Sequence, residues 1–227
     1  MDKEKIIENA IDFVKEALKN AEGGHDWFHI ERVFKNTLLI AENEKVDTFI
    51  VSLAALLHDI ADPKFHYGDE EIGPKMASDF LEQQQVDNAA ITHIINIIKH
   101  ISFKNSFDTK SSSTQEINSE KFTSKELEVV QDADRLDAIG AIGIARCFNY
   151  GGFKNRALYN PEIKPNLNMS KEEYKNSEAP TINHFYEKLL LLKGKMNTNS
   201  GQKIAESRHQ FMETYLEQFY NEWNGKL

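Results

Sequence analysis

The chain has 227 residues, of which 40% are hydrophobic and 28% charged, and its net charge at pH 7 is −9. This length and composition are typical of an ordinary globular protein with room for a large core, and they exclude a disordered chain. No segment approaches the run of about 20 apolar residues that a membrane helix needs, and we expect no signal peptide. The acidic balance, without a basic stripe, argues against binding to long nucleic acids.

The cysteine content points to a reducing compartment. Cys147 is the only cysteine, so no intrachain disulfide can form, and the cytoplasm is the expected location. We expect Cys147 to be a small, buried helix residue and not a nucleophile.

The spacing of apolar residues predicts an all-α protein, because they recur mostly three and four positions apart and Gly and Pro are few. Asp47 is a suitable N-cap for the third predicted helix, which is apolar nearly all round and therefore belongs at the centre of the fold. A capping box at 123–126 opens a long helix to about Tyr150. In chain order, we predict helices over about 3–18, 25–41, 48–60, 72–84, 88–102, 123–150, 181–193 and 202–223.

Two stretches are expected to lack regular structure. Residues 103–122 lose all periodicity and are rich in Ser, Thr, Asn and Lys, which predicts a mobile surface loop that could act as a lid. Residues 151–180 are expected to be loop with short turns at most. No better boundary exists, so we predict one domain over 1–227.

Polar residues inside apolar helices are the most informative feature for function. His58 and Asp59 interrupt the most apolar helix, where an ionised Asp is costly unless it is paired or bound to a metal. The alternative is that the two residues mark the solvated end of the helix or satisfy each other. His25 and His29 lie four apart at a helix start, a spacing that lets neighbouring turns point at one ion.

Three carboxylates, those of Asp132, Asp134 and Asp137, fall in another apolar helix, with the last two sharing a face. Histidine and aspartate together suit Mn, Mg, Ni, Co, Fe or Zn. With no thiolates available, a structural zinc site of the cysteine type is excluded.

Three motifs carry a family resemblance. HxxRV at 29–33, LLHDIAD at 56–62 and DADRLDAIGAIGIAR at 132–146 together resemble the HD superfamily of metal-dependent phosphohydrolases. The resemblance continues into NHFYEKLLLLKGKMNT and IAESRHQFM, and is greatest to a small bacterial branch that hydrolyses nucleotides. It implies a single-domain helical fold with the metal site between central helices, and one divalent ion, with Mn favoured.

The same resemblance assigns four metal ligands, His29, His58, Asp59 and Asp134. Asp134 is preferred because the family's ligand immediately precedes the basic residue of the D-x-D-[RK] run, and Asp132 is the alternative. His25 is either a further ligand or a partner of Asp26.

Four more residues are expected near the substrate. Asp62 matches a position at which the family helps to activate water, although a residue before proline can equally cap the helix end. Lys64, His100 and Arg146 are predicted substrate-binding residues. The alternatives are a solvated Lys64 and an ordinary salt bridge for Arg146.

The function that follows is hydrolysis of a nucleoside triphosphate, in particular a deoxynucleoside triphosphate, to the monophosphate and pyrophosphate. The alternatives are a phosphomonoesterase or a cyclic-nucleotide phosphodiesterase on the same site, and a non-catalytic metal and nucleotide sensor. The expected partner is a small phosphorylated substrate, and the protein is expected to be a monomer or a homodimer. The aromatic residues of the last two helices form a packing surface or a dimer face.

Overall fold

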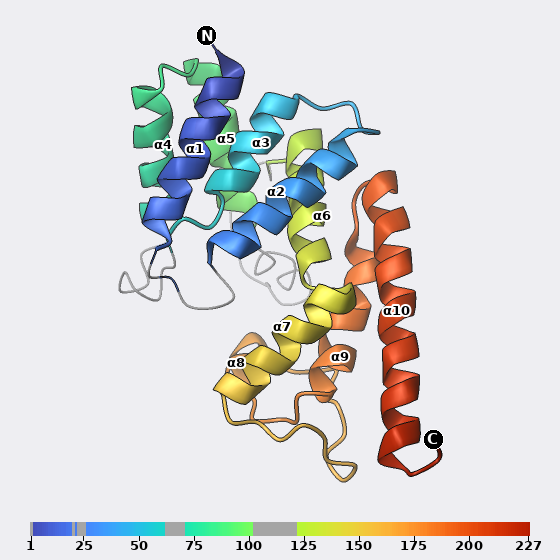
Figure 1. Cartoon of the computed structure of the whole chain (residues 1–227). Helices are drawn as coiled ribbons and strands as arrows, with labels where there is room; N and C mark the ends of the chain where they lie inside the picture. The colour runs from blue at the N-terminus through green and yellow to red at the C-terminus, as the bar shows by residue number, and fades with distance from the viewer. Residues whose placement is uncertain (1, 20, 22–25, 62–70, 102–121) are drawn as a thin grey trace, which may run out of the picture. The chain divides into compact units, whose positions relative to one another are not determined.

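The structure is a computed structural model that describes all residues except 1, 20, 22–25, 62–70 and 102–121 (Figure 1). Every regular element among the described residues is helical, which confirms the predicted all-α fold. None of the described helices is both long and apolar enough to cross a membrane. Apart from Phe122, the predicted loop at 103–122 lies outside the described residues.

The contacts divide the chain into two compact units, Met1–Ala133 and Asp134–Leu227. Two compact units can still belong to one folding domain, so the predicted single domain over 1–227 stays a prediction.

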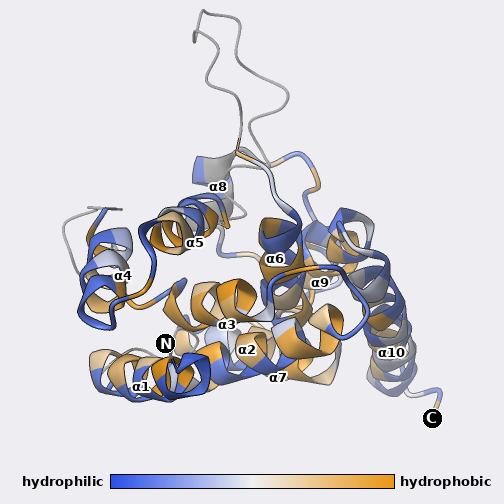
Figure 2. Cartoon of the chain, turned by 90° about the horizontal axis from the view of Figure 1, so that it is seen from above, coloured by the Kyte–Doolittle hydropathy of each residue, from blue (hydrophilic) through white to orange (hydrophobic). Residues whose placement is uncertain are grey.

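The first unit is built around one apolar helix. This helix, α3 (Thr48–Leu57), packs against α1 (Lys3–Ala17), α2 (Trp27–Ala41) and α5 (Asn88–His100), and α4 (Ile72–Gln83) packs against α5. Every residue of α3 from Phe49 to Leu57 is buried, and the helix is largely orange in the hydropathy colouring of Figure 2. The central place predicted for this segment is confirmed.

Aspartate caps set the starts of the helices in this unit. The carboxylates of Asp2, Asp26, Asp47 and Asp87 each accept a hydrogen bond from backbone N–H groups of the following first turn. Such caps satisfy backbone N–H groups that have no partner within the helix. This is why an aspartate such as Asp47 predicts a helix start.

The sixth helix, α6 (Lys125–Asp137), begins one residue later than the predicted capping box implies. The Ser124 hydroxyl accepts from the Leu127 N–H at 3.0 Å, so Ser124, and not Thr123, is the cap. Glu126 accepts instead from the Asp47 N–H, and thereby connects the start of α6 to the start of α3.

Helix α3 ends at Leu57, three residues before the predicted end at Ile60. The His58 ring Nδ1 lies 2.8 Å from the carbonyl oxygen of Ala55. In a continued helix this carbonyl would accept from the backbone N–H of Asp59. The ring of His58 thus donates to the carbonyl oxygen that the next backbone N–H of a continued helix would use.

The second unit contains α7 (Gly140–Phe153), α8 (Lys171–Asn176), α9 (Asn183–Glu187), the 3-10 helix η4 (Leu189–Lys195) and α10 (Asn199–Trp223). Helix α10 packs against α7 and η4. The predicted α-helix over 181–193 is wrong, because Lys188 leaves the helical region at φ −143° and ψ −59°. Leu189 and Leu192, three residues apart, are both buried, a spacing that suits three residues per turn.

The predicted long helix to Tyr150 is also wrong, because the chain breaks between α6 and α7 at Ala138 and Ile139. Gly140 has φ +75°, which is the left-handed region that favours glycine. At Gly143 a Cβ atom would lie 2.3 Å from the carbonyl oxygen of Ala138. Only glycine at both positions therefore permits this close turn.

Aromatic side chains of α10 pack within the second unit, as predicted. Tyr215 stacks on Phe185 at 5.9 Å between ring centroids, and Tyr159 contacts the rings of Phe219, Tyr220 and Trp223. A dimer face on the same helix stays a prediction.

Candidate metal centre

Three of the four predicted ligands converge in the first unit. His29, His58 and Asp59 each offer one ligand atom, and these atoms all lie within 4.8 Å of one another. His29 is only 3% exposed, and the two imidazole rings meet edge-on with centroids 5.4 Å apart. Side chains from α2 and from the residues that directly follow α3 thus lie together.

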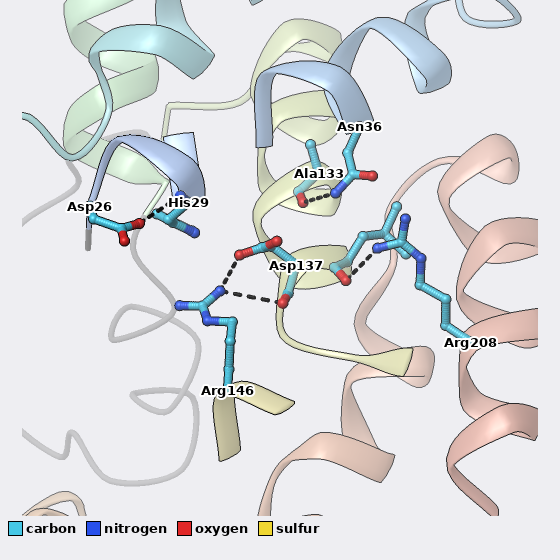
Figure 3. Close-up of polar contacts among 8 residues, drawn as sticks. Asp26, His29, Asn36, Ala133, Asp137, Arg146 and Arg208 are labelled. Carbon is cyan, nitrogen blue, oxygen red and sulfur yellow. Dashed lines mark hydrogen bonds and ion pairs between the residues drawn. The ribbon is translucent and has the colours of Figure 1, made fainter. Parts of the chain in front are cut away.

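Helix α2 positions His29. Asp26 accepts from the His29 N–H at 3.0 Å and fixes the first turn of the helix (Figure 3). Two turns further along α2, the Asn36 amide donates to the Ala133 carbonyl on α6 at 3.3 Å. Because α2 also packs on α3, the ring of His29 is held towards the residues that follow α3.

The carbonyl of Ala55 determines the tautomer of His58. A carbonyl oxygen can only accept, so Nδ1 of His58 must donate in this 2.8 Å contact. The lone pair is then on Nε2, the atom left to bind an ion. Metal-ligating histidines are commonly oriented in this way, by a carbonyl that accepts from the other ring nitrogen.

The chemistry of this donor set fits a divalent cation. Two imidazoles and one carboxylate suit borderline and hard ions, and a partly buried carboxylate beside two rings gains from a cation between them. The three side chains therefore fit a divalent cation, as the sequence analysis predicts.

The fourth predicted ligand, Asp134, belongs to the second unit, so its assignment stays a prediction. The two candidate carboxylates of α6 differ in their surroundings, because Asp132 is 0% exposed whereas Asp134 is partly exposed.

Arg146 pairs with a buried carboxylate. Its guanidinium contacts a carboxylate oxygen of Asp137, which is 1% exposed, and the Asp137 carbonyl at 3.3 Å (Figure 3). Arg208 on α10 donates to the Leu136 carbonyl at 2.6 Å. The contact with Asp137 is the salt bridge anticipated as the alternative for Arg146, and its role in substrate binding stays a prediction.

The ring of His100, like that of His58, contacts a backbone carbonyl of the preceding turn through Nδ1. Its Nδ1 donates to the Asn96 carbonyl at 2.7 Å, which directs Nε2 away from the helix, and its ring lies 5.4 Å from that of Phe122. A substrate-binding role for His100 stays a prediction. Asp62, Lys64 and His25 lie outside the described residues.

Two polar residues of the second unit were missed by the sequence analysis. Burial, together with Lys188 and Arg156, lowers the pKa of His184 to about 3. Burial also lowers the pKa of Lys188, and Asp134 acts in the opposite sense. The spacing of four between His184 and Lys188 inside an apolar segment could have revealed them.

Cys147 lies in α7, as expected, but it is only partly buried and not fully buried as predicted. Its thiol lies 3.7 Å from the carbonyl of Thr181, and burial raises its pKa to about 12. A thiol of this kind is not a nucleophile at neutral pH.

A pocket of about 280 Å³ also lies in the second unit. Tyr159, Pro161, Lys164, Asn183, Tyr186 and Tyr220 are among its lining residues. None of the predicted site residues that the structure describes lines this pocket.

Known proteins match the chain along almost its whole length. The sequence pattern of the HD domain family matches residues 27–139. YpgQ of Bacillus subtilis is 35% identical over 221 residues, which are 97% of this chain and 95% of YpgQ. The chain belongs to the HD superfamily.

Solved structures agree with this membership. A crystal structure of an HD-superfamily hydrolase from Bacillus thuringiensis is 43% identical, with a TM-score of 0.76 and 98% of both chains covered. The structure of Bacillus subtilis YpgQ in complex with ADP is 33% identical, with a TM-score of 0.73 and coverage of 98% of this chain and 97% of that one. These relatives support a hydrolase.

The HD region at 27–139 contains all four predicted ligands. Its adjacent histidine and aspartate, His58 and Asp59, are the pair that lies beside His29 in the first unit.

Proposed function

We propose that this HD protein is a divalent-metal-dependent phosphohydrolase that cleaves nucleoside triphosphates, in particular deoxynucleoside triphosphates, to the monophosphate and pyrophosphate. The observation that carries the proposal is the convergence of His29, His58 and Asp59 in a member of a hydrolase superfamily. The ADP complex of YpgQ supports a nucleotide as the ligand. The single cysteine is in keeping with a cytoplasmic location.

The ion is held by His29, His58, Asp59 and Asp134, and Mn²⁺ is the favoured ion. These four residues would hold the ion and leave it accessible to water and substrate. When bound, such an ion polarises a phosphoryl group and lowers the pKa of a bound water. The contact between His58 and the Ala55 carbonyl keeps a ring lone pair directed at the site before any ion arrives.

The remaining predicted residues handle the proton and the substrate. Asp62 accepts the proton of the attacking water. Lys64, His100 and Arg146 contact the nucleotide. The roles of Asp62 and His100 rest on the family resemblance, whereas Lys64 and Arg146 are assigned as cations for an anionic substrate.

Attack at the α-phosphorus is proposed from the family resemblance and the single set of metal ligands together, because pyrophosphate is a better leaving group than an alkoxide. The sequence has no GxxxxGK[ST] loop to hold β- and γ-phosphates and no second full ligand set for a two-metal clamp. Held by the four proposed ligands, one ion would bind a phosphoryl oxygen and a water. The new P–O bond then forms at the α-phosphorus, and the bond to the β-phosphate breaks to release pyrophosphate.

Phosphorus NMR of the reaction with Mn²⁺ and a deoxynucleoside triphosphate tests the proposal. We expect signals of the monophosphate and of pyrophosphate in equal amounts. Orthophosphate with a diphosphate product would show γ-cleavage, and nucleoside with tripolyphosphate would show cleavage of the ester bond. Turnover of monophosphates or cyclic nucleotides alone would establish the phosphoesterase alternatives, and binding without turnover would establish the sensor.

A further inference from the structure

The pocket in the second unit has no part in the proposed metal centre. Its volume is about 280 Å³, and residues of the loop at 159–165, of α9 and of α10 line it. Three of these residues are tyrosines, Tyr159, Tyr186 and Tyr220, and the polar ones include Lys164 and Asn183. Small-molecule sites span roughly 300–1,000 Å³, so a pocket of this size suits a compound with a single ring and is too small for a nucleoside triphosphate.

Contacts among the lining residues hold the walls of this pocket in place. The Asn183 amide donates to the Ile163 carbonyl at 3.1 Å and thereby fixes the loop to α9. The Tyr186 hydroxyl donates to that of Tyr220 at 3.2 Å and connects α9 to α10. The ring of Tyr159 meets that of Tyr220 edge-on, with centroids 5.4 Å apart. The pocket is therefore formed before a ligand arrives, which keeps the conformational cost of binding low.

The tyrosines of the lining favour an aromatic ligand. Aromatic rings attract one another in offset-stacked and edge-on arrangements, beyond the effect of the area that they bury. Burial and the hydrogen bond with Tyr186 raise the pKa of Tyr220, so its hydroxyl stays protonated at neutral pH. The tyrosines thus present neutral rings and hydroxyls, and a planar ring is the ligand group that they contact best.

Asn183 offers an acceptor to such a ligand. The residue is only 1% exposed, its Nδ2 is engaged with Ile163, and no described residue donates to its Oδ1. This oxygen is not among the enclosed atoms without a partner in the described part of the chain, so it is accessible from the pocket. Because a buried acceptor without a donor is unfavourable, a ligand N–H or O–H group gains by bonding to it.

Lys164 supplies the charge of the pocket. It is the one charged residue in the described lining, its side chain is exposed, and it forms no ion pair with a described carboxylate. An ammonium group in this position repels cationic ligands and attracts a carboxylate. The ligand should therefore be an anion.

We propose that this pocket binds a small aromatic acid, with its ring against the tyrosines, an N–H or O–H donor at Asn183 and its anionic group at Lys164. The inference goes beyond the proposed function and does not depend on it, because none of the described lining residues is a proposed metal ligand. The chain thus has a second ligand site, for a different chemical class.

Anthranilate is a suitable probe, because it combines one aromatic ring, an amino donor and a carboxylate. Three matched compounds each lack one of these features: 2-aminocyclohexanecarboxylate lacks the aromatic ring, benzoate the donor and anthranilamide the charge. Each compound is titrated calorimetrically into the full-length protein. We expect one saturable site per chain for anthranilate, with a Kd below about 1 mM. The other three compounds should bind roughly three- to tenfold more weakly, the effect of losing one favourable interaction.

Two lysine variants place the probe in this pocket. Lys164→Gln removes the charge of the lining, and Lys195→Gln is the matched control, because it removes an exposed lysine of the same unit that does not line the pocket. Lys164→Gln should weaken anthranilate binding roughly three- to tenfold and leave anthranilamide binding unchanged. Lys195→Gln should match the wild type with both compounds. His58→Ala should bind anthranilate as the wild type does, because His58 belongs to the metal centre.

The absence of saturable anthranilate binding would overturn the inference, and so would an equal affinity of Lys164→Gln and the wild type. Loss of binding in His58→Ala would overturn it as well, because the probe would then occupy the metal centre. Turnover of a triphosphate, measured in parallel, separates the two proposals. A protein that hydrolyses triphosphates without binding anthranilate refutes only this inference, and one that binds anthranilate without turnover refutes only the proposed reaction.

Discussion

Replacing Gly151 by alanine probes the close packing of α7 on Thr181. The new Cβ would lie 2.2 Å from Oγ1 and 2.9 Å from Cγ2 of Thr181. Thr181 cannot easily retreat, because it is 4% exposed and its backbone N–H donates to the Ala157 carbonyl at 2.9 Å. Overpacking of this severity costs about 3 kcal/mol, at the upper end of the usual range.

The helix recovers part of that cost. Alanine is favoured over glycine in a helix by about 1 kcal/mol, so Gly151→Ala should lower the unfolding free energy by about 2 kcal/mol. For a chain of this length the melting temperature should fall by about 4–8 °C. Thermal melts and urea unfolding followed by circular dichroism measure both quantities.

The neighbouring glycine supplies the control. A Cβ on Gly152 meets nothing within 4 Å, so Gly152→Ala should leave stability unchanged or raise it by up to about 1 kcal/mol. In a Thr181→Ala background the cost of Gly151→Ala should nearly vanish, since only a 3.1 Å contact with Cβ remains. Equal stabilities of Gly151→Ala and Gly152→Ala in the wild-type background would refute the close packing of α7 on Thr181.

Three further predictions concern the metal, the proton and pH. His58→Ala and Asp134→Asn should each lose the ion and all turnover, whereas Asp132→Asn should retain it; normal metal content in the first two by elemental analysis would exclude them as ligands. Asp62→Ala should keep the ion but lower the rate by roughly 10²–10⁴, as expected for loss of a general base, and an unchanged rate would leave it as a helix cap. Burial lowers the pKa of His184 in the folded state to about 3, below its ordinary value of 6.5. The contribution of neutral His184 to the unfolding free energy should therefore be fully present above pH 6.5 and be lost as the pH falls towards 3. His184→Gln should reduce this loss in urea unfolding between pH 6.5 and 4, and identical pH slopes would contradict the assignment.

Local patterns in the sequence predicted the all-α fold class and the central apolar helix with its Asp47 cap. The family resemblance then singled out His29, His58 and Asp59, which lie together in the structure. Apolar spacing reports which face of a segment is buried, and an aspartate before a helix satisfies its own first turn; both act within a few residues. His58 and Asp59 stood out for the same reason, because ionisable groups within the most apolar helix need a partner.

Tertiary structure decided where helices end and which residues distant in the sequence contact one another. At the break before Gly140, Arg208 donates to the Leu136 carbonyl from 72 residues away. In the same unit, Gly151 of α7 lies directly against Thr181, 30 positions further along the chain. No local pattern encodes such contacts, because their free energy comes from residues that only the folded chain brings together.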